Sequence, residues 1–243
     1  MTTAFGDADE LRGSAHAWYM HVSSFRSAGV ADRRVSRLPA DERARYAELQ
    51  TESARERYLA ARVLCRETLS RYTGVDPDLW RFTKGSWGKP MVAQPDGFDA
   101  LRFNVSSAAD LVICIVTRAG EVGVDVEDTT RGVDASLVAR HFLPETASAR
   151  ISALPAHERR QRFFEQWILK EAYVKATGRG LVETDERFGV EQDEDGTPIP
   201  IAGCRFSLHR LDADCVAAAA VLPQRRGETI RFQWLAADGT LDE

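Results

Sequence analysis

The sequence has 243 residues and a mass of 27.0 kDa, which suits one large domain or two small halves. Hydrophobic residues make up 44% and charged residues 28%, a globular composition that excludes disordered and fibrous classes. The net charge of −5 provides no overall positive field, so we expect no binding to nucleic acid or to an anionic membrane.

No apolar run approaches the length of a membrane-spanning helix. The longest runs, at residues 111–116 and 216–222, are far shorter than the roughly 18 to 20 residues that a span requires. The first residues, MTTAFGDADELRG, are acidic and polar, unlike the basic and then apolar order of a signal peptide. We therefore expect a cytoplasmic protein. Four cysteines lie in apolar stretches without CxxC spacing, which favours buried free thiols: Cys65, Cys114, Cys204 and Cys215.

The predicted elements alternate between helix and strand along the chain. Residues 40–73 have apolar positions at helical spacing between Pro39 and Gly74, which predicts a helix. Residues 80–127 contain short β-like runs separated by turn residues, which predict a small antiparallel sheet. After a loop at 128–134 helical patterning returns, with Pro155 suited to the first turn of a long helix and Gly178 to the position beyond its end. Strands are expected again near residues 187–191, 204–209, 214–222 and 229–235.

Two stretches of the chain resemble each other. RFNVSSAADLVICIV at 102–116 and RFSLHRLDADCVAAAAV at 205–221 share an RF start, a polar turn and an apolar strand, and each follows a long helix. The sequence therefore predicts an α+β fold, a pseudo-dimer of two similar helix-plus-antiparallel-sheet halves. We place the N-terminal half at residues 1–128 and the C-terminal half at 129–243, with the functional site in the cleft between them.

The segment EVGVDVED carries the first candidate acids. Strand alternation puts three valines on one face and Asp125 and Glu127 on the other, about 7 Å apart along the strand. Two carboxylates near Gly123, where a ligand can approach the backbone, suit a hard cation such as Mg²⁺. A solvated strand edge is the alternative, and a further acid is needed to favour the metal.

The segment FFEQWILKEAYVKATGRG supplies that acid. On a helix Glu171 continues the apolar stripe of Phe164, Trp167 and Ile168 instead of facing water. A carboxylate in that position needs a partner, and Lys175 lies one turn further on. An exposed Glu–Lys pair is the ordinary explanation. The functional explanation is that Glu171 is a metal ligand and proton carrier beside Lys175, with Lys170 next to it in sequence.

Lysine is rare in this chain and is confined to two segments. Of 32 basic residues only Lys84, Lys89, Lys170 and Lys175 are lysines, and an ammonium differs from a guanidinium at phosphate and proton-transfer sites. The loop KGSWGKP at 84–90 offers two of them with a flexible backbone, which suits phosphate binding, although a plain hairpin turn has the same composition. Arg57 on the preceding helix is a further candidate cation.

Other kinds of site fit poorly. The histidines are scattered without HExxH or Cys/His spacing, and GxSxG, GKS/GKT and GxGxxG patterns are missing from the sequence. The residues themselves therefore favour chemistry that combines Mg²⁺, phosphate and proton transfer.

Four motifs in order resemble the long, Sfp-type class of the 4′-phosphopantetheinyl transferases: GKP (88–90), FNVSS (103–107), GVDVE (123–127) and WILKEAYVKATGRGL (167–181). The resemblance covers residues 57–181 and continues more loosely through the last strands. It implies a pseudo-dimeric fold and an enzyme that moves the phosphopantetheine arm of coenzyme A onto a serine of an apo acyl or peptidyl carrier protein. The other product would be adenosine 3′,5′-bisphosphate.

The resemblance also implies roles for individual residues. Asp125, Glu127 and Glu171 would hold Mg²⁺, or Mn²⁺, on the coenzyme A pyrophosphate, with Glu171 taking the serine proton directly or through water. Lys175 would neutralise the leaving bisphosphate. The residues expected to contact coenzyme A are Arg57 and Lys89 at the 3′-phosphate, Ser106 and Ser107 in the same pocket, and Lys170 and Lys175 from the helix.

One position departs from the family pattern. The family usually has His after the serine of this motif, where this chain has Ser107, so a charged contact to coenzyme A is expected to be missing. A non-catalytic homologue that binds carrier protein or coenzyme A is therefore an alternative, and a Mg²⁺ pyrophosphatase or nuclease is another. The expected partners are carrier domains of polyketide, non-ribosomal peptide or fatty acid synthases, and a monomer suffices because both halves belong to one chain.

Overall fold

A computed structural model describes residues 8–25, 30–85, 88–132, 135–179, 189–190, 192–193, 196–201 and 203–237. The same series of elements occurs twice. The first series is β1 (Ser14–His21), α1 (Val30–Arg37), α2 (Ala40–Glu48), α3 (Glu52–Thr73), β4 (Arg102–Ala108) and β5 (Leu111–Thr117). The second is β6 (Gly120–Asp128), α4 (Ala135–Phe142), α5 (Glu145–Ala153), α6 (Ala156–Thr177), β7 (Arg205–Arg210) and β8 (Cys215–Pro223). The three helices of each series have 8, 9 and 22 residues, so the predicted pseudo-dimer is confirmed.

The sheets follow the same repeat. One sheet has the order β4-β5-β1-β9, where β9 is Arg231–Ala236, and the other has the order β6-β8-β7. β1 is antiparallel to β5 as β6 is antiparallel to β8, whereas β9 joins β1 in parallel. A separate hairpin consists of β2 (Arg81–Lys84) and β3 (Pro90–Gln94). Short 3₁₀ turns lie at Glu10–Arg12, Val22–Phe25 and Pro77–Leu79.

The strand pairing corrects two of the predictions. Residues 80–127 do not form one small sheet, because their strands enter three different sheets. The halves divide between β5 and β6, at residues 118–119, and not at residue 128, because β6 pairs along its whole length with β8. β9 also returns to the first sheet. Alternation predicts which face of a strand is buried and does not predict the strand that pairs with it.

Three smaller differences concern the element boundaries. The predicted helix at 40–73 is two helices, because the backbone is extended at Leu49 and the Thr51 side chain caps α3 by accepting from the Ala54 amide at 3.2 Å. Gly189 and Val190 lie in no strand, and residues 187, 188 and 191 of that predicted strand lie outside the described residues. β1 was not predicted.

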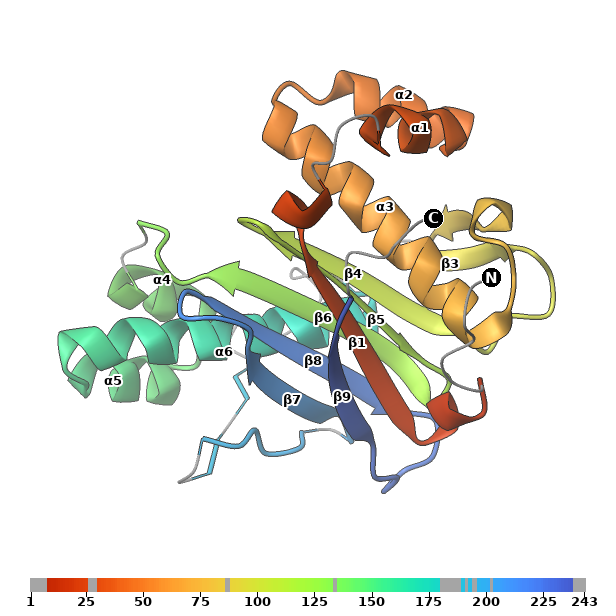
Figure 1. Ribbon diagram of the computed structural model, residues 1–243. Helices are drawn as coiled ribbons and strands as arrows, with labels where there is room; N and C mark the ends of the chain where they lie inside the picture. Colours follow the sequence, from red (N-terminus) through yellow and green to blue (C-terminus); the bar gives the residue numbers. More distant parts are fainter. Residues whose placement is uncertain are drawn as a thin grey trace.

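The elements stack in four layers (Figure 1). α3 covers one face of the first sheet and α6 covers one face of the second, and each helix shares an apolar core with its sheet. A third core lies between the two sheets and contains Ile113, Ile115, Val122, Val124 and Val126. The alternation predicted for β6 is therefore confirmed. The four cysteines are free and buried, and no helix in the described part of the chain is long and apolar enough to cross a membrane.

A chain of buried polar groups runs through the first half. His16 Nδ1 lies 2.6 Å from the hydroxyl of Tyr72, and His16 Nε2 lies 2.9 Å from Ser14 Oγ. The Tyr72 hydroxyl also accepts from Trp18 Nε1 at 3.0 Å. We assign the Nε2–H tautomer to His16, because Tyr72 then donates to Nδ1 and every group is satisfied. A second proton on the ring would leave the Tyr72 hydroxyl without an acceptor, and burial already lowers the pKa of His16.

We expect the stability of this protein to fall as the pH drops below about 6.5, the ordinary value for histidine. The unfolded chain takes up a proton on His16 there, whereas the folded chain resists it until its own lower pKa is reached, so protonation favours unfolding across that window. Urea unfolding from about pH 8 to about pH 5 measures this dependence. His16→Gln is expected to flatten the slope, and an unchanged slope in that variant would exclude His16 as its source.

Candidate active site

The site is built where α6 approaches β6 most closely. A Cβ atom on Gly123 would lie 2.1 Å from the carbonyl oxygen of Ala172 and 2.4 Å from the amide nitrogen of Ala176, so only glycine permits this contact. One turn of α6 thus lies directly on the strand. The contact brings Glu171 and Lys175 of α6 against the face of β6 that carries Asp125.

Asp125, Lys175 and Ser106 form a tight polar cluster. Lys175 Nζ donates to Asp125 Oδ1 at 2.6 Å and to Ser106 Oγ at 3.0 Å, and Ser106 Oγ donates to the same Asp125 oxygen at 2.9 Å. Asp125 is only 6% exposed, which rules out the solvated strand edge. Because Ser106 belongs to β4 in the first half and the other two residues to the second half, the cluster spans both halves.

Glu171 and Glu127 complete the acidic side of the site. Burial, and then the negative charge of Asp125, raise the pKa of Glu171, while Lys175 opposes the shift. Glu127 adds a smaller repulsion and accepts an ion pair from Arg131 at 2.8 Å. Lys175 pairs with Asp125, so the simple exposed Glu171–Lys175 pair is not what the structure contains. Three carboxylates therefore share one region of unfavourable negative charge.

The buried carboxylate of Asp125 has an oxygen that could bind a divalent cation. Asp125 Oδ2 is buried and has no hydrogen-bond partner, although Oδ1 of the same carboxylate has two. An orphaned carboxylate oxygen beside a second, destabilised carboxylate fits a cation. Among the described residues no three or more acidic, His or Cys side chains lie close enough together to hold a metal ion by themselves. The arrangement therefore fits Mg²⁺ that takes its other ligands from phosphate and water, as Mg²⁺ commonly does.

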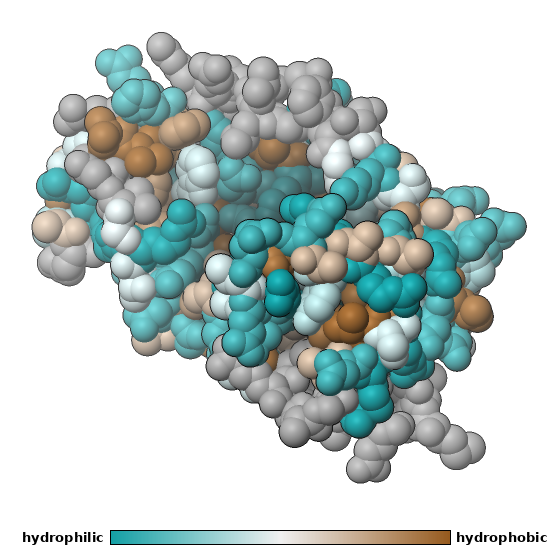
Figure 2. All heavy atoms as spheres, turned by 90° about the horizontal axis from the view of Figure 1, so that it is seen from above, coloured by the Kyte–Doolittle hydropathy of each residue, from teal (hydrophilic) through white to brown (hydrophobic). Residues whose placement is uncertain are grey.

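A cavity of about 750 Å³ opens beside the Asp125–Lys175–Ser106 cluster. Its walls come from α2, α3, the β2–β3 hairpin and β4, and α6 contributes Lys175. Cationic side chains outnumber acidic ones in this lining: Arg45, Arg57, Arg62, Lys84 and Lys175 against Asp41 and Glu42. The face of the molecule seen from above is hollowed near its middle, and hydrophilic residues surround much of that hollow (Figure 2). The cavity suits a large anionic ligand.

The predicted ligand-binding residues separate into two groups. Arg57, Ser106, Ser107 and Lys175 line the cavity. Lys170 does not belong to it and is a correction, because it is 1% exposed and its ammonium donates to the carbonyl oxygen of Phe142 at 2.5 Å. A helix turns successive side chains about 100° apart, so Lys170 points away from the face that carries Glu171 and Lys175.

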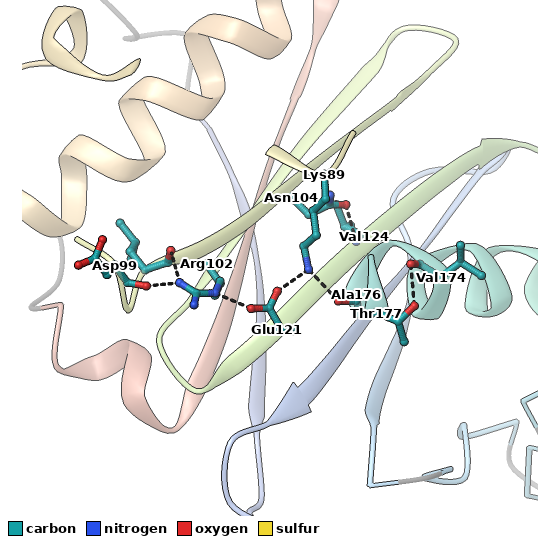
Figure 3. Close-up of polar contacts among 10 residues, drawn as sticks. Lys89, Asp99, Arg102, Asn104, Glu121, Val124, Val174, Ala176 and Thr177 are labelled. Carbon is teal, nitrogen blue, oxygen red and sulfur yellow. Dashed lines mark hydrogen bonds and ion pairs between the residues drawn. The ribbon is translucent and has the colours of Figure 1, made fainter. Parts of the chain in front are cut away.

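Lys89 is a second correction. Its ammonium donates to Glu121 Oε2 and to the carbonyl oxygen of Ala176, both at 2.7 Å (Figure 3). Lys89 is not among the residues that line the cavity. The other oxygen of Glu121 accepts from Arg102 Nε at 2.5 Å. Burial lowers the pKa of Lys89, although Glu121 opposes the shift. Lys89 therefore acts within the protein in this structure, and not as a free cation at the ligand.

Asn104 is a site residue that sequence reasoning missed. It is 5% exposed, and its side-chain oxygen accepts from the Val124 amide at 3.1 Å. No strand pairs with β6 on that side in the described structure, so Asn104 supplies the bond that a neighbouring strand would otherwise make. The motif FNVSS contained this residue, and a buried Asn flanked by strand residues was the available signal.

The repeat explains why the acidic cluster occurs once. Arg71 and Lys175 both lie two residues before the end of equivalent helices, α3 and α6. Lys175 contacts Asp125, whereas Arg71 lies over the ring of Trp18 at 4.7 Å. β9 also lies beside β1, where its Trp234 stacks on His209 of β7. The equivalent place in the first half thus has Trp18 in contact with the cation, and β9 pairs with the edge of β1 whose counterpart on β6 has no paired strand in the described structure.

The chain is similar in sequence to known 4′-phosphopantetheinyl transferases. Residues 121–221 match the family model of the 4′-phosphopantetheinyl transferase superfamily, and residues 29–119 match that of the 4′-phosphopantetheinyl transferase N-terminal domain. The 4′-phosphopantetheinyl transferase HetI of Nostoc sp. is 34% identical over 187 residues, which are 76% of this chain and 78% of that protein. A phosphopantetheinyl transferase of Thraustochytrium sp. is 30% identical over 227 residues, which cover 85% of this chain and 78% of that protein. The 4′-phosphopantetheinyl transferase Sfp of Bacillus subtilis is 33% identical over 141 residues, which cover 58% of this chain and 60% of that protein.

The two family models meet at the boundary between the structural halves, and the similarity to HetI spans more than two thirds of both chains. The chain therefore belongs to the 4′-phosphopantetheinyl transferase superfamily, in its long, Sfp-type class.

Proposed function

We propose that this protein transfers the 4′-phosphopantetheine arm of coenzyme A to a serine of an apo acyl or peptidyl carrier protein, that is, that it is a holo-carrier-protein synthase. The observation that carries the proposal is that Lys175 and Ser106 both line a largely cationic cavity and both bind Asp125, with Glu171 close by. Phosphoryl transfer needs positioned charges more than a covalent nucleophile, and this cluster supplies them. Family membership supports the same reaction.

The proposed reaction forms one bond and breaks one. The carrier serine oxygen attacks the phosphorus that bears the pantetheine arm, and the bond from that phosphorus to the bridging pyrophosphate oxygen breaks. Adenosine 3′,5′-bisphosphate leaves with the bridging oxygen. Glu171, which lies close to Asp125 and Lys175, would accept the serine proton. Lys175 lies where it can neutralise the charge that develops on the leaving group.

Asp125, with Glu127 and Glu171, would hold Mg²⁺ on the pyrophosphate. The cation would supply charge neutralisation for the phosphate oxygens. Arg57, Ser106 and Ser107 would contact the nucleotide part of coenzyme A from the cavity wall. Because both halves of the site come from one chain, we propose that a monomer in the cytoplasm performs the reaction, on carriers of polyketide, non-ribosomal peptide or fatty acid synthases.

Intact-mass spectrometry of an apo carrier protein tests this function. The carrier, coenzyme A, Mg²⁺ and this protein are incubated together, and we expect a mass gain of one phosphopantetheine that disappears when the metal is chelated. Restoring Mg²⁺ should restore the gain. If several apo carriers remain unmodified while coenzyme A binds, the protein is a non-catalytic binding homologue instead. Hydrolysis of coenzyme A without a carrier would favour the pyrophosphatase alternative.

Ser107 provides a prediction about ligand affinity. It is exposed on the cavity wall, at the position where the family pattern usually has His. A charged hydrogen bond to phosphate contributes about 1.5 to 3 kcal/mol. We therefore expect Ser107→His to lower the Kd for coenzyme A by about tenfold at pH 6 and by less at pH 8, where imidazole is neutral. Calorimetric titration measures both values, with Ser107→Asn as the uncharged control, and an affinity equal to that of the control would contradict the prediction.

A further inference from the structure

The hairpin β2–β3 forms part of the cavity wall without belonging to either large sheet. It contributes Phe82, Thr83, Lys84 and Pro90 to the lining, yet its two strands pair only with each other in the described structure. A two-stranded hairpin is marginally stable by itself. Side-chain contacts must therefore hold it against the rest of the molecule.

Lys89 makes the contact that joins this hairpin to the second half. The residue stands immediately before β3, and its carbonyl oxygen accepts from the Gly85 amide at 2.9 Å, which closes the turn. Its ammonium is bound by Glu121 of β6 and by the carbonyl oxygen of Ala176 in the last turn of α6. Its stem passes Gly178, where a Cβ atom would lie 3.4 Å from Lys89 Cδ. The side chain is 12% exposed, so these bonds are largely shielded from water.

Glu121 is held from a second direction. Arg102 of β4 binds its other oxygen at 2.5 Å and also donates to the carbonyl oxygens of Asp99 and Leu101 (Figure 3). The carboxylate thus links the hairpin, β4 and β6 at one point. Glu121 lies on the same face of β6 as Asp125, and Ala176 directly follows Lys175 in α6. The Lys89 ammonium therefore binds both elements that carry the proposed catalytic residues.

We propose that Lys89 and Glu121 form a clamp that positions the β2–β3 wall of the cavity against the last turn of α6, and that Lys89 is a positioning residue without direct contact to the 3′-phosphate. The expected effect of the clamp on coenzyme A binding rests on the proposed function. Its expected effect on the hairpin is independent of that function. Removing Lys89 leaves the Glu121 carboxylate with Arg102 alone and releases the Ala176 carbonyl. The wall then loses its charge-assisted anchor.

Hydrogen exchange of the protein without ligand is the first test. Lys89→Met is expected to speed amide exchange in residues 81–94 by about tenfold, and Glu121→Gln by less, because the amide still accepts one bond from Lys89. Lys84→Met is the matched control on the same hairpin, since Lys84 is exposed, and it should leave exchange in the hairpin unchanged. Exchange in residues 81–94 that is equal in Lys89→Met and wild type would overturn the clamp, whether or not the protein is a transferase.

Ligand binding is the second test and separates positioning from direct contact. The probes are coenzyme A and the same molecule without its 3′-phosphate. A clamp predicts that Lys89→Met weakens both by the same factor, about tenfold, because the wall is shared. A loss confined to the ligand with the 3′-phosphate would show direct contact and overturn the proposal. Tighter coenzyme A binding in Glu121→Gln would do the same, because it would mean that Glu121 competes with phosphate for Lys89.

Discussion

Glu171→Gln is expected to lower kcat for carrier modification by about a thousandfold, the range of a lost general base. The amide keeps the shape of the side chain but cannot accept the serine proton, and it removes one carboxylate from the region of Asp125. Coenzyme A affinity measured without Mg²⁺ should change by only about threefold, because Glu171 is not part of the cavity lining, whereas affinity with Mg²⁺ should fall further because one proposed ligand of the cation is lost. Single-turnover transfer to an apo carrier, followed by intact mass, measures the rate, and titration with coenzyme A measures the affinity.

Glu158→Gln is the matched control for this variant. Glu158 lies in the first turn of the same helix and is exposed, so the same chemical change should leave kcat within about twofold of wild type. Thermal unfolding of both variants separates a loss of activity from a loss of fold. A Glu171→Gln protein with the kcat of Glu158→Gln would remove Glu171 from the proposed chemistry.

Gly123→Ala is expected to lower the free energy of unfolding by about 4 kcal/mol or to prevent folding. The added methyl group would lie within 3 Å of three backbone atoms of α6. A flexible side chain could change its rotamer to relieve such a clash, whereas the helix backbone cannot. The helix must therefore move away from β6, which also separates Lys175 from Asp125. Urea unfolding measures the loss, and the transfer assay measures the activity of any folded fraction.

Gly13→Ala is the control for the glycine substitution. A Cβ atom at Gly13 would meet nothing within 4 Å, and its φ of −123° is open to other residues, so the change should alter stability by less than about 1 kcal/mol. Equal stabilities of the two variants would show that α6 adjusts freely. The close approach would then not be what sets the geometry of the site.

The carboxylates illustrate what local pattern can predict. Alternation along β6 places Val122, Val124 and Val126 in the core between the sheets and puts Asp125 on the opposite face, as the sequence indicated. Helical spacing likewise brings Glu171 and Lys175 onto one face of α6. These predictions hold because each depends on the geometry of a single element. The resemblance of the four motifs to a known family provided two things that these local patterns could not, namely the order of the elements and the family itself.

The lysines illustrate where local pattern is not enough. Lys170 and Lys89 occur in the same short segments as cavity and cluster residues, and composition alone could not separate them from Lys84 and Lys175. The carbonyl oxygen of Phe142 binds one, and Glu121 with Ala176 binds the other. All three partners come from other elements: Phe142 from α4, Glu121 from β6 and Ala176 from α6. Adjacency in the chain therefore did not indicate the function of either ammonium.

The amino-acid order is sufficient for the class of fold, the two-fold repeat and the face of the strand or helix on which each acidic residue lies, because burial pattern and periodicity act over a few neighbouring residues. Strand pairing, the boundary between the halves and the assignment of each lysine depend on contacts between distant parts of the chain. β6 joins β8 and not β5, β9 returns to β1, and Lys89 reaches Glu121 only once the halves are packed. A buried charge is placed by whichever acceptor lies nearby after packing, since leaving it without one is more costly than any local preference.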